Sequence, residues 1–596
     1  EPGVASERAR IAMEAWQETE GEPLQRRQAL KLKKILDNVP VVIFPGELLV
    51  GSQTKYFRGG NPQPDYDGTV LENLMAEGHI TMGGPEVVGI HTREDWDALV
   101  EVGKYFRGKT AAEAVRKTRK SVMGSWYDDL ADAGGVQRTE GYPQFVGVPD
   151  FARILRIGLR GHIRECEQKI EQFRESKSHD TEALEFWQAV IIASEATIAL
   201  SRRYAALARE LAAREFNPKR RAELEQIAEV CQWVPENPAR TFHEALQSQV
   251  MMDLALCLES PPSGVSGWGI VDQDWYPYFR KDLDEGRLTL EQAADLVGCS
   301  MTYNARRERV AEITWRDHLQ KGLVQSYTIG GKTRDGKGDA TNELSYLILH
   351  VAALLAYAEP HIALRWHAGT PRWLMQKAIE ANCRVRGGVP QFQNSEHVVR
   401  VLVEAGCSAE SARDWVGEGC SLAQPADMRT SMVPTYFNIA LPVDLALHNG
   451  VASLTGKQLG PKTGDAADFK SFQDLFDAFK QQTEHMMRGA LWHANLAEKV
   501  KSEHWMAPLS SSVHPGTIEK GRDMTRGGLV HYRDWIMKDR AIVAAADSLL
   551  AVKKLVFDNR KLSMQELVQA LDSDFSGERG EKIRRLCLAA PKYGQE

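Results

Sequence analysis

Apolar and polar residues alternate at helical spacing along most of the chain. Over residues 4–37 apolar side chains recur at this spacing among Arg, Lys and Glu, until Pro45 and Gly46 interrupt the pattern. Thr241, with Glu244 three residues later, is typical of a helix start with a capping box. The chain is predicted to be mostly helical, with amphipathic helices over 150–217, 219–230, 241–258, 290–305, 341–357 and 371–385.

Short runs typical of β-strands lie between these helices and end in glycine or polar residues. Strands alternating with helices predict an α/β fold, a barrel or sheet in which the loops at the strand ends carry the chemistry. Residues 60–150 are richer in Gly, Pro and aromatic residues, and we expect loops and short elements there. The predicted strands are 41–44, 325–331, 361–367 and 389–394.

Composition and charge are those of an ordinary globular protein. Hydrophobic residues make up 43% and charged residues 26%, and 74 basic against 81 acidic side chains give a formal charge of -7. This near balance argues against nucleic acid or a membrane surface as partner and favours small molecules. No charged leader with an apolar core opens the chain, and no apolar run is long enough to span a bilayer, so a cytoplasmic location is expected.

Most cysteines are expected to be reduced core residues. The chain has no CxxC pair, and its eight cysteines are scattered over positions 166, 231, 257, 299, 383, 407, 420 and 587. His361 and His367 flank a predicted strand, but their spacing matches no metal motif, and core or substrate-contacting roles are expected. No metal is predicted. GxGxxG after a strand, GxxxxGK[ST], HExxH and GxSxG are all missing, which removes the usual support for nucleotide-binding, zinc-protease and serine-hydrolase functions.

The stretch DWVGEGCSLAQPADMR, residues 414–429, is the candidate for chemistry. Gly417 and Gly419 permit tight or left-handed turns, so Cys420 could stand at the tip of a loop inside a cavity, where a radical relay or a nucleophile would be needed. A buried, inert structural cysteine is the alternative, and the stretch alone leaves both open.

Four further segments, 22–52, 231–247, 327–349 and 546–558, together with the cysteine loop, resemble glycyl radical enzymes of the pyruvate formate-lyase and glycerol dehydratase superfamily. The resemblance implies a ten-stranded α/β barrel with a helix-rich periphery over 1–596, a helical and loop region at about 1–150, and two finger loops inside it. One loop would carry the thiyl radical on Cys420 and the other a protein-derived glycyl radical. No RVxGY-like motif is found, so the glycyl radical domain is expected to be absent from this chain. A radical-SAM activating enzyme and a homo-oligomer are the implied partners.

Comparison within the superfamily favours one branch. Dehydratases and many lyases of the superfamily read GCVE, with Glu as general base two residues after Cys, where this chain has Leu422. Their His-Ser pair is replaced by Gly264 and Val265, and the second cysteine of pyruvate formate-lyase is replaced by Ser421. The resemblance therefore indicates a fumarate-adding enzyme of the alkylsuccinate or benzylsuccinate synthase type, acting in anaerobic hydrocarbon degradation, with fumarate, a hydrocarbon and small accessory subunits as partners.

In this interpretation Arg429 binds a carboxylate of fumarate, because a guanidinium stays charged and binds carboxylates bidentately. An apolar pocket beside Cys420 is expected from Gly419, Leu422, Trp268, Trp366 and Trp415. Ordinary core roles for each tryptophan and a loop-bracing role for Arg429 are the alternatives. At the level of function, the alternatives are a glycyl radical arylacetate decarboxylase or other carbon-carbon lyase, and a barrel scaffold without a radical domain.

Overall fold

The computed structural model describes residues 2–77, 79–81, 87–140, 146–260, 266–308, 310, 325–419, 422–431, 436–530 and 538–595. The chain divides into two units. The larger unit comprises residues 1–113, 141–432 and 501–534, and the smaller unit comprises 114–140, 433–500 and 535–596.

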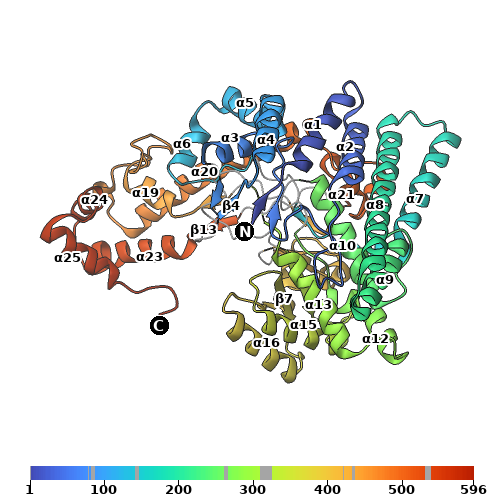
Figure 1. Cartoon of the computed structure of the whole chain (residues 1–596). Coiled ribbons are helices and arrows are strands. Elements are labelled where there is room, and N and C mark those ends of the chain that lie inside the picture. The colour runs from blue at the N-terminus through green and yellow to red at the C-terminus, as the bar shows by residue number, and fades with distance from the viewer. Residues whose placement is uncertain are drawn as a thin grey trace. The chain divides into compact units, whose positions relative to one another are not determined.

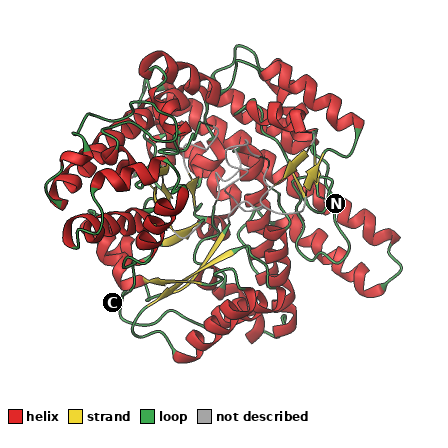
Figure 2. Cartoon of the chain, turned by 90° about the vertical axis from the view of Figure 1, so that its left-hand side faces the viewer, coloured by secondary structure: helices red, strands yellow, loops and turns green. Residues whose placement is uncertain are grey.

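Helices predominate over strands in the chain (Figure 2), and the strands of the larger unit are short. Its helices are α1 (Glu7–Glu18), α2 (Leu24–Asn38), α3 (Thr69–Glu77), α4 (Arg93–Phe106), α7 (Phe151–Glu175), α8 (Thr181–Arg214), α9 (Pro218–Trp233), α10 (Phe242–Glu259), α11 (Val271–Asp274), α12 (Tyr276–Asp284), α13 (Leu290–Ala305), α15 (Glu343–Leu355), α16 (Arg372–Val385), α17 (Ser395–Glu404), α18 (Ala409–Arg413), α21 (Pro508–Ser512), α22 (Thr517–Lys520) and the 3-10 helix η2 (Met524–Arg526). Its strands are β1 (Gly3–Val4), β2 (Gly59–Gly60), β3 (His79–Thr81), β4 (Val87–Gly89), β5 (Val146–Gly147), β6 (Ser326–Gly330), β7 (His361–Trp366), β8 (Gln391–Asn394), β9 (Val416–Glu418), β10 (Leu422–Gln424) and β11 (Thr430–Ser431).

The smaller unit is also mainly helical. Its two strands, β12 (Tyr436–Asn438) and β13 (Lys538–Arg540), pair in parallel. Its helical elements are most of α5 (Ala111–Met123), α6 (Trp126–Asp132), α19 (Leu441–Leu447), η1 (Ala466–Asp468), most of α20 (Phe472–His504), α23 (Ile542–Val552), the π-helical turn η3 (Lys553–Asp558), α24 (Met564–Asp572) and α25 (Gly577–Leu588).

Most predicted helices are present, and local capping explains their ends. The predicted helix 150–217 is two helices, because Asp180 ends the intervening loop by accepting the backbone N–H of Ala183 and so starts α8. Thr241 caps α10 as predicted by accepting from Glu244 N. The Glu244 carboxylate, however, accepts from the N–H of Arg240 at 2.7 Å, one residue before the expected partner.

Two expectations from the sequence are wrong. Residues 41–44 form no strand, because they lie between two prolines and run into a turn in which Phe44 N donates to the Glu47 carboxylate at 2.7 Å. Residues 60–150 are also more helical than expected. Thr92 caps α4 by accepting from Asp95 N, and the helix then buries a stripe of apolar side chains at helical spacing, Leu99, Val102 and Phe106.

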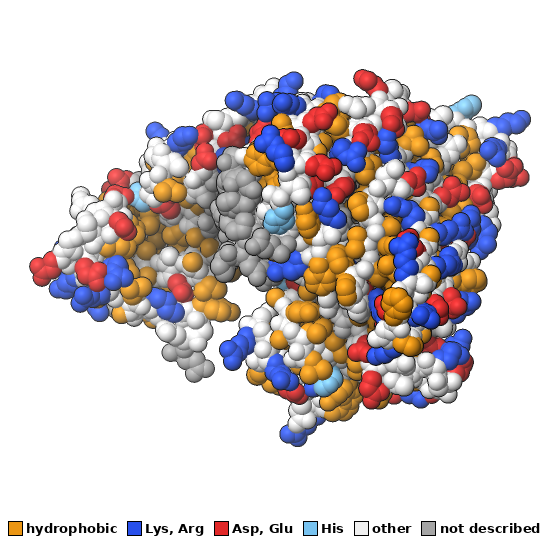
Figure 3. Space-filling view, in the orientation of Figure 1, with side chains coloured by type: hydrophobic (Ala, Val, Ile, Leu, Met, Phe, Trp, Pro, Cys, Tyr) orange, Lys and Arg blue, Asp and Glu red, His pale blue; other side chains and the backbone are white. Residues whose placement is uncertain are grey.

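Long helices form the core of the larger unit. Helix α8 packs against α2, α7 and α9, which lie side by side in Figure 1, and α10 is buried along almost its whole length. Among the described residues, α8 is long and apolar enough to cross a membrane by length and composition, but 61% of its most apolar stretch is buried inside the protein. Basic and acidic side chains are interspersed over the face shown in Figure 3, as the near balance of charges predicts.

A buried ionic cluster ties the first residues of the chain to the core. Asp65 accepts from Arg8 Nη1 at 2.5 Å and from Lys31 Nζ at 2.8 Å, and all three side chains are fully buried. The Lys31 ammonium also lies 4.0 Å above the ring of Trp505. Burial lowers the pKa of Lys31 to about 8, although the Asp65 carboxylate opposes this shift. The cluster is a paired buried charge of the kind whose disruption is costly.

The parallel sheet β6–β7–β8 positions the candidate site. Its strands pair in the order of the chain, with Ser326 opposite His361 and Ala363 opposite Gln391. Because successive side chains of a strand point to opposite faces, Tyr327, Ile329, Ile362 and Leu364 face the main hydrophobic core, where all four are buried. The other face carries alternate residues, namely Ser326, Thr328, His361, Ala363 and Arg365.

Candidate active site

The cysteine motif of the sequence forms an antiparallel hairpin, β9–β10, in the larger unit. Glu418 pairs with Leu422, Gly417 with Ala423, and Val416 with Gln424. Cys420 and Ser421 lie outside the described residues. The hairpin register nevertheless fixes the two residues from which the chain enters and leaves this segment, Gly419 and Leu422, and Gly419 has the left-handed φ of 49° that its residue type permits.

Strand β9 is bonded to side chains of the sheet. Gly417 N donates to Thr328 Oγ1 at 2.8 Å, and Ser326 Oγ donates to Gly417 O at 2.7 Å. Gly419 N donates to the carbonyl of Ser266 at 2.8 Å. A Cβ atom added to Gly417 would lie 2.8 Å from the Cβ of Ala363, so the glycine allows the strand to approach this close.

The two histidines of the sequence pattern are both buried, and they have different partners. His361 Nδ1 donates to Gly419 O at 3.2 Å, one residue before Cys420. His367 Nε2 lies 2.9 Å from the carboxylate of Asp339. Burial lowers the pKa of His361, although the bond to the Gly419 carbonyl opposes the shift. Among the residues that the structure describes, no group of three or more His, Cys, Asp or Glu side chains could hold a metal ion.

A buried carboxylate lies beside position 422, and the sequence reasoning missed it. Glu418 is 2% exposed, and one of its carboxylate oxygens accepts from Gln424 Nε2 at 2.9 Å. Directly paired residues in an antiparallel ladder project their side chains to the same face, so Glu418 and Leu422 share one face of the hairpin. The sequence signal was present, since Glu418 is the acidic residue of the GEGC motif two positions before Cys420.

Arg429 is buried next to carboxylates of its own chain. Its Nη2 lies 3.9 Å from Asp150 Oδ1, its Nη1 has no hydrogen-bond partner, and its φ of 54° is left-handed. Burial would raise the pKa of Asp150, but the charge of Arg429, the hydrogen bond from the Arg153 N–H and the charges of Arg156 and Arg153 together outweigh burial, and the pKa is lowered. Burial raises the pKa of Asp274 to about 7, and Arg429 opposes this shift. The guanidinium charge is therefore shared with two acidic side chains.

The predicted tryptophans are packed into the protein. Trp268 is fully buried, donates from Nε1 to Asp253 at 3.3 Å, and packs in a tilted arrangement against Tyr327, with ring centroids 5.3 Å apart. Trp415 is also fully buried and donates from Nε1 to Ser395 Oγ at 3.1 Å. Trp366, at the end of β7, is half-buried and packs against the same core. These contacts are those of core residues, and a pocket-lining role for the three remains a prediction.

The described residues enclose a cavity in the larger unit and two in the smaller unit, one of them about 730 Å³ in volume beside Phe472 and Phe557, and the predicted site residues that the structure describes line none of these three. In the larger unit a cavity of about 530 Å³ is bordered by Asp150 and His514. His514 Nδ1 donates to Ser510 O at 2.7 Å, and burial lowers the pKa of His514 to about 4, so the imidazole is neutral.

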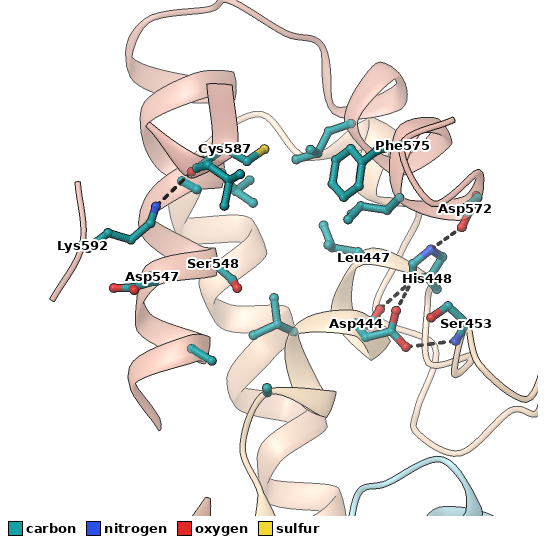
Figure 4. A pocket seen from close by; sticks show the side chains of 18 residues that line it. Asp444, Leu447, His448, Ser453, Asp547, Ser548, Asp572, Phe575, Cys587 and Lys592 are labelled. Carbon is teal, nitrogen blue, oxygen red and sulfur yellow. Dashed lines mark hydrogen bonds and ion pairs between the residues drawn. The ribbon is translucent and has the colours of Figure 1, made fainter. Parts of the chain in front are cut away.

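In the smaller unit a cavity of about 510 Å³ is lined mainly by apolar side chains of α19, α23, α24 and α25 (Figure 4). His448 lies at its edge, with Nδ1 3.0 Å from Asp444 Oδ1 and Nε2 2.9 Å from Asp572 Oδ1. The hydrogen bond to Asp444 raises the pKa of His448 to about 9. Carboxylates hold both ring nitrogens, so this histidine is a cation that ties α19 to α24.

Comparison with known proteins gives a consistent result. The model of the family "Pyruvate formate lyase-like" matches residues 1–596. The isethionate sulfite-lyase of Oleidesulfovibrio alaskensis is 31% identical over an alignment of 609 residues that covers 100% of this chain and 72% of the relative. The trans-4-hydroxy-L-proline dehydratase of Clostridioides difficile is 28% identical, covering 100% and 75%. The structure of the B12-independent glycerol dehydratase from Clostridium butyricum superposes with a TM-score of 0.90 at 30% identity, covering 100% of this chain and 74% of that one.

These similarities confirm the barrel fold of the glycyl radical enzymes and overturn the predicted reaction. The relatives include dehydratases, a sulfite-lyase and an indoleacetate decarboxylase, so the interpretation as a fumarate-adding enzyme is wrong, and with it the assignment of fumarate and a hydrocarbon as substrates. The physical reason lies in the hairpin. Leu422 removes a carboxylate from one strand, but the register places Glu418 directly opposite, so a missing Glu at position 422 does not imply a site without acid-base chemistry.

Proposed function

Because the chain belongs to the pyruvate formate lyase-like family of glycyl radical enzymes, we propose that it catalyses radical elimination of a leaving group, water or sulfite, from a small hydroxyl-bearing substrate. The proposal takes its reaction class from the relatives. The observation in this chain that supports the proposal is the buried carboxylate of Glu418. Glu418 stands two residues before Cys420 and shares a hairpin face with Leu422.

Elimination needs proton transfer as well as radical chemistry. A substrate carbon that bears a hydroxyl group loses a hydrogen atom, and the leaving group on the neighbouring carbon then departs. Departure is easier when the hydroxyl proton is removed and the leaving group is protonated, which a positioned carboxylate can accelerate by roughly 10²- to 10⁴-fold. Addition of a carbon radical to an alkene needs no such group, so the carboxylate favours elimination.

We assign the steps to residues as follows. Cys420 would give the hydrogen atom of its thiol to the protein-derived glycyl radical of the family, which would leave a thiyl radical on Cys420. The Cys420 thiyl takes a hydrogen atom from the hydroxyl-bearing carbon. Glu418 accepts the hydroxyl proton and returns it to the departing group, leaving a carbonyl-stabilised carbon radical. That radical regains a hydrogen atom from Cys420, so the reaction has no net redox change. A radical-SAM activating enzyme is the expected partner.

The test is an anaerobic turnover assay on the full-length protein after activation by a radical-SAM activating enzyme. The substrate panel contains isethionate, glycerol and 1,2-propanediol, each with a hydroxyl-bearing carbon next to the carbon that carries the leaving group, with detection of released sulfite or carbonyl product. We expect conversion of at least one of these compounds, and no conversion by Cys420→Ala with its fold intact by circular dichroism.

An arylacetate in the same panel tests the alternative reaction, since a decarboxylase would release carbon dioxide. Decarboxylation without elimination, or full activity of Cys420→Ala, would refute the proposed function.

A further inference from the structure

We propose that Ser326, Thr328 and His361 form a bracket of side chains that holds the main chain of β9 and so sets the position of Cys420. The three residues lie on two adjacent strands, β6 and β7, and all three are buried. The functional part of this inference, a role in turnover, rests on the proposed function. The structural part rests on hydrogen bonds between described residues alone.

The bracket follows from the period of the strands. Ser326 and Thr328 are two residues apart on β6, and His361, Ala363 and Arg365 are two residues apart on β7, so all five point to the face opposite the hydrophobic core. Polar side chains on a buried face need hydrogen-bond partners. Here the partners are backbone groups of β9 and its flanking residues.

The bonds are spaced along β9 in the same two-residue period. At its base, Arg365 Nη1 donates to Trp415 O at 2.9 Å while its Nη2 donates to Gly330 O at 2.7 Å. In the middle, Gly417 is held at both its N–H and its carbonyl, at 2.8 and 2.7 Å. Near the tip, His361 holds the carbonyl of Gly419 at 3.2 Å. Side chains of the sheet thus contact backbone groups of residues 415, 417 and 419, which lie along one edge of β9 and its flanking residues.

This geometry holds the backbone rather than the reactive group. A hydrogen atom transfers between two heavy atoms only at short range, and a displacement of about 1 Å can cost about 100-fold in rate. Gly417 and Gly419 have no side chains of their own to brace the hairpin, so the bracketing side chains supply the rigidity that two glycines remove. These are positioning residues, and Cys420 remains the group proposed to react.

Thr328→Val is the sharpest test, because it removes the hydroxyl with almost no change of volume. Thr328→Ser keeps the hydroxyl and is the matched control, and Ser326→Ala is a second variant if Thr328→Val folds poorly. Hydrogen exchange of the Gly417 amide, followed by mass spectrometry of peptides covering 415–419, reports the bracket without any need for turnover. We expect about tenfold faster exchange in Thr328→Val and wild-type exchange in Thr328→Ser.

The role in positioning is measured in the activated full-length protein. Radical content by electron paramagnetic resonance, kcat, KM and the deuterium isotope effect are compared, using whichever panel substrate the wild type converts, deuterated at the carbon that loses hydrogen. Thr328→Val should keep the wild-type radical content and KM, lose about 10- to 100-fold in kcat, and show a larger isotope effect. Thr328→Ser should have the wild-type kcat and isotope effect.

Unchanged amide exchange in Thr328→Val overturns the bracket. Faster exchange with unchanged kcat and isotope effect overturns its role in positioning. A wild type that converts no substrate instead refutes the proposed function, and the exchange experiment still decides the bracket.

Discussion

Replacing the carboxylate of Glu418 by an amide is the perturbation that tests its proposed catalytic role most directly. Glu418→Gln keeps the size of the side chain and can still accept from Gln424 Nε2, which donates at 2.9 Å in the wild type. The structural loss should therefore stay near 1 kcal/mol, the usual net value of one hydrogen bond. Loss of proton transfer should cost roughly 10²- to 10⁴-fold in kcat, or about 2.7 to 5.4 kcal/mol of transition-state free energy. The two effects differ enough to be separated.

The double variant Glu418→Leu with Leu422→Glu returns the carboxylate to the opposite strand. Directly paired Cβ atoms in an antiparallel ladder lie about 4.5 to 5.5 Å apart, a distance that a Glu side chain can span. We expect the double variant to recover at least about tenfold of the activity that Glu418→Leu loses, as measured by kcat in the anaerobic assay with equal radical content. Wild-type turnover by Glu418→Gln would show that this carboxylate transfers no proton. If the double variant recovers no activity although its melting temperature is that of the wild type, the position of the carboxylate matters and not only its charge.

Two further predictions concern stability. Asp65→Asn leaves two buried cations without their carboxylate, so we expect the free energy of unfolding to fall by about 3 to 5 kcal/mol. The fall should appear as a lower midpoint of urea unfolding, followed by tryptophan fluorescence. An unchanged midpoint would contradict the burial of this cluster. The pKa of His448 is raised to about 9 in the folded state, so its stabilisation should be complete below about pH 6.5 and lost as the pH rises through about 9. Because its partner Asp572 is exposed, we expect the charged His448 to contribute only about 1 kcal/mol to the free energy of unfolding. The contribution is measured as a fall in melting temperature between pH 6.5 and 9.5 that His448→Gln should lack. Equal falls in both proteins would refute the prediction.

Local patterns in the sequence determined much of the secondary structure. Helical spacing of apolar residues predicted α9, α10, α13, α15 and α16 close to their observed ends, and Thr241 marked a helix start because an N-cap needs only its own neighbours. Three of the four predicted strands are present for the same reason. The run at 41–44 failed because its composition suits a strand, whereas its flanking prolines and the Glu47 turn prevent pairing.

The family and its barrel were also accessible from the sequence, through five collinear segments. The reaction was not accessible in this way, because the residue type at position 422 does not show which residue lies opposite it across a hairpin. Leu422 in place of a glutamate suggested a site without a base, yet a hairpin brings two positions of the chain to one place on its surface, and Glu418 lies opposite. A single position does not define the chemistry of a site when a neighbouring strand can supply the same group.

Only the tertiary structure decided which polar residues meet. Asp65 lies 57 residues from Arg8 and 34 from Lys31, and His361 lies 58 residues from the Gly419 carbonyl. In the sequence alone His361 is one histidine beside a strand. One face of the sheet is hydrophobic and packs into the core. The opposite face, which carries His361 and Thr328, therefore points towards β9. Periodicity assigns a residue to a face, but burial of the opposite face against distant helices decides what that face contacts.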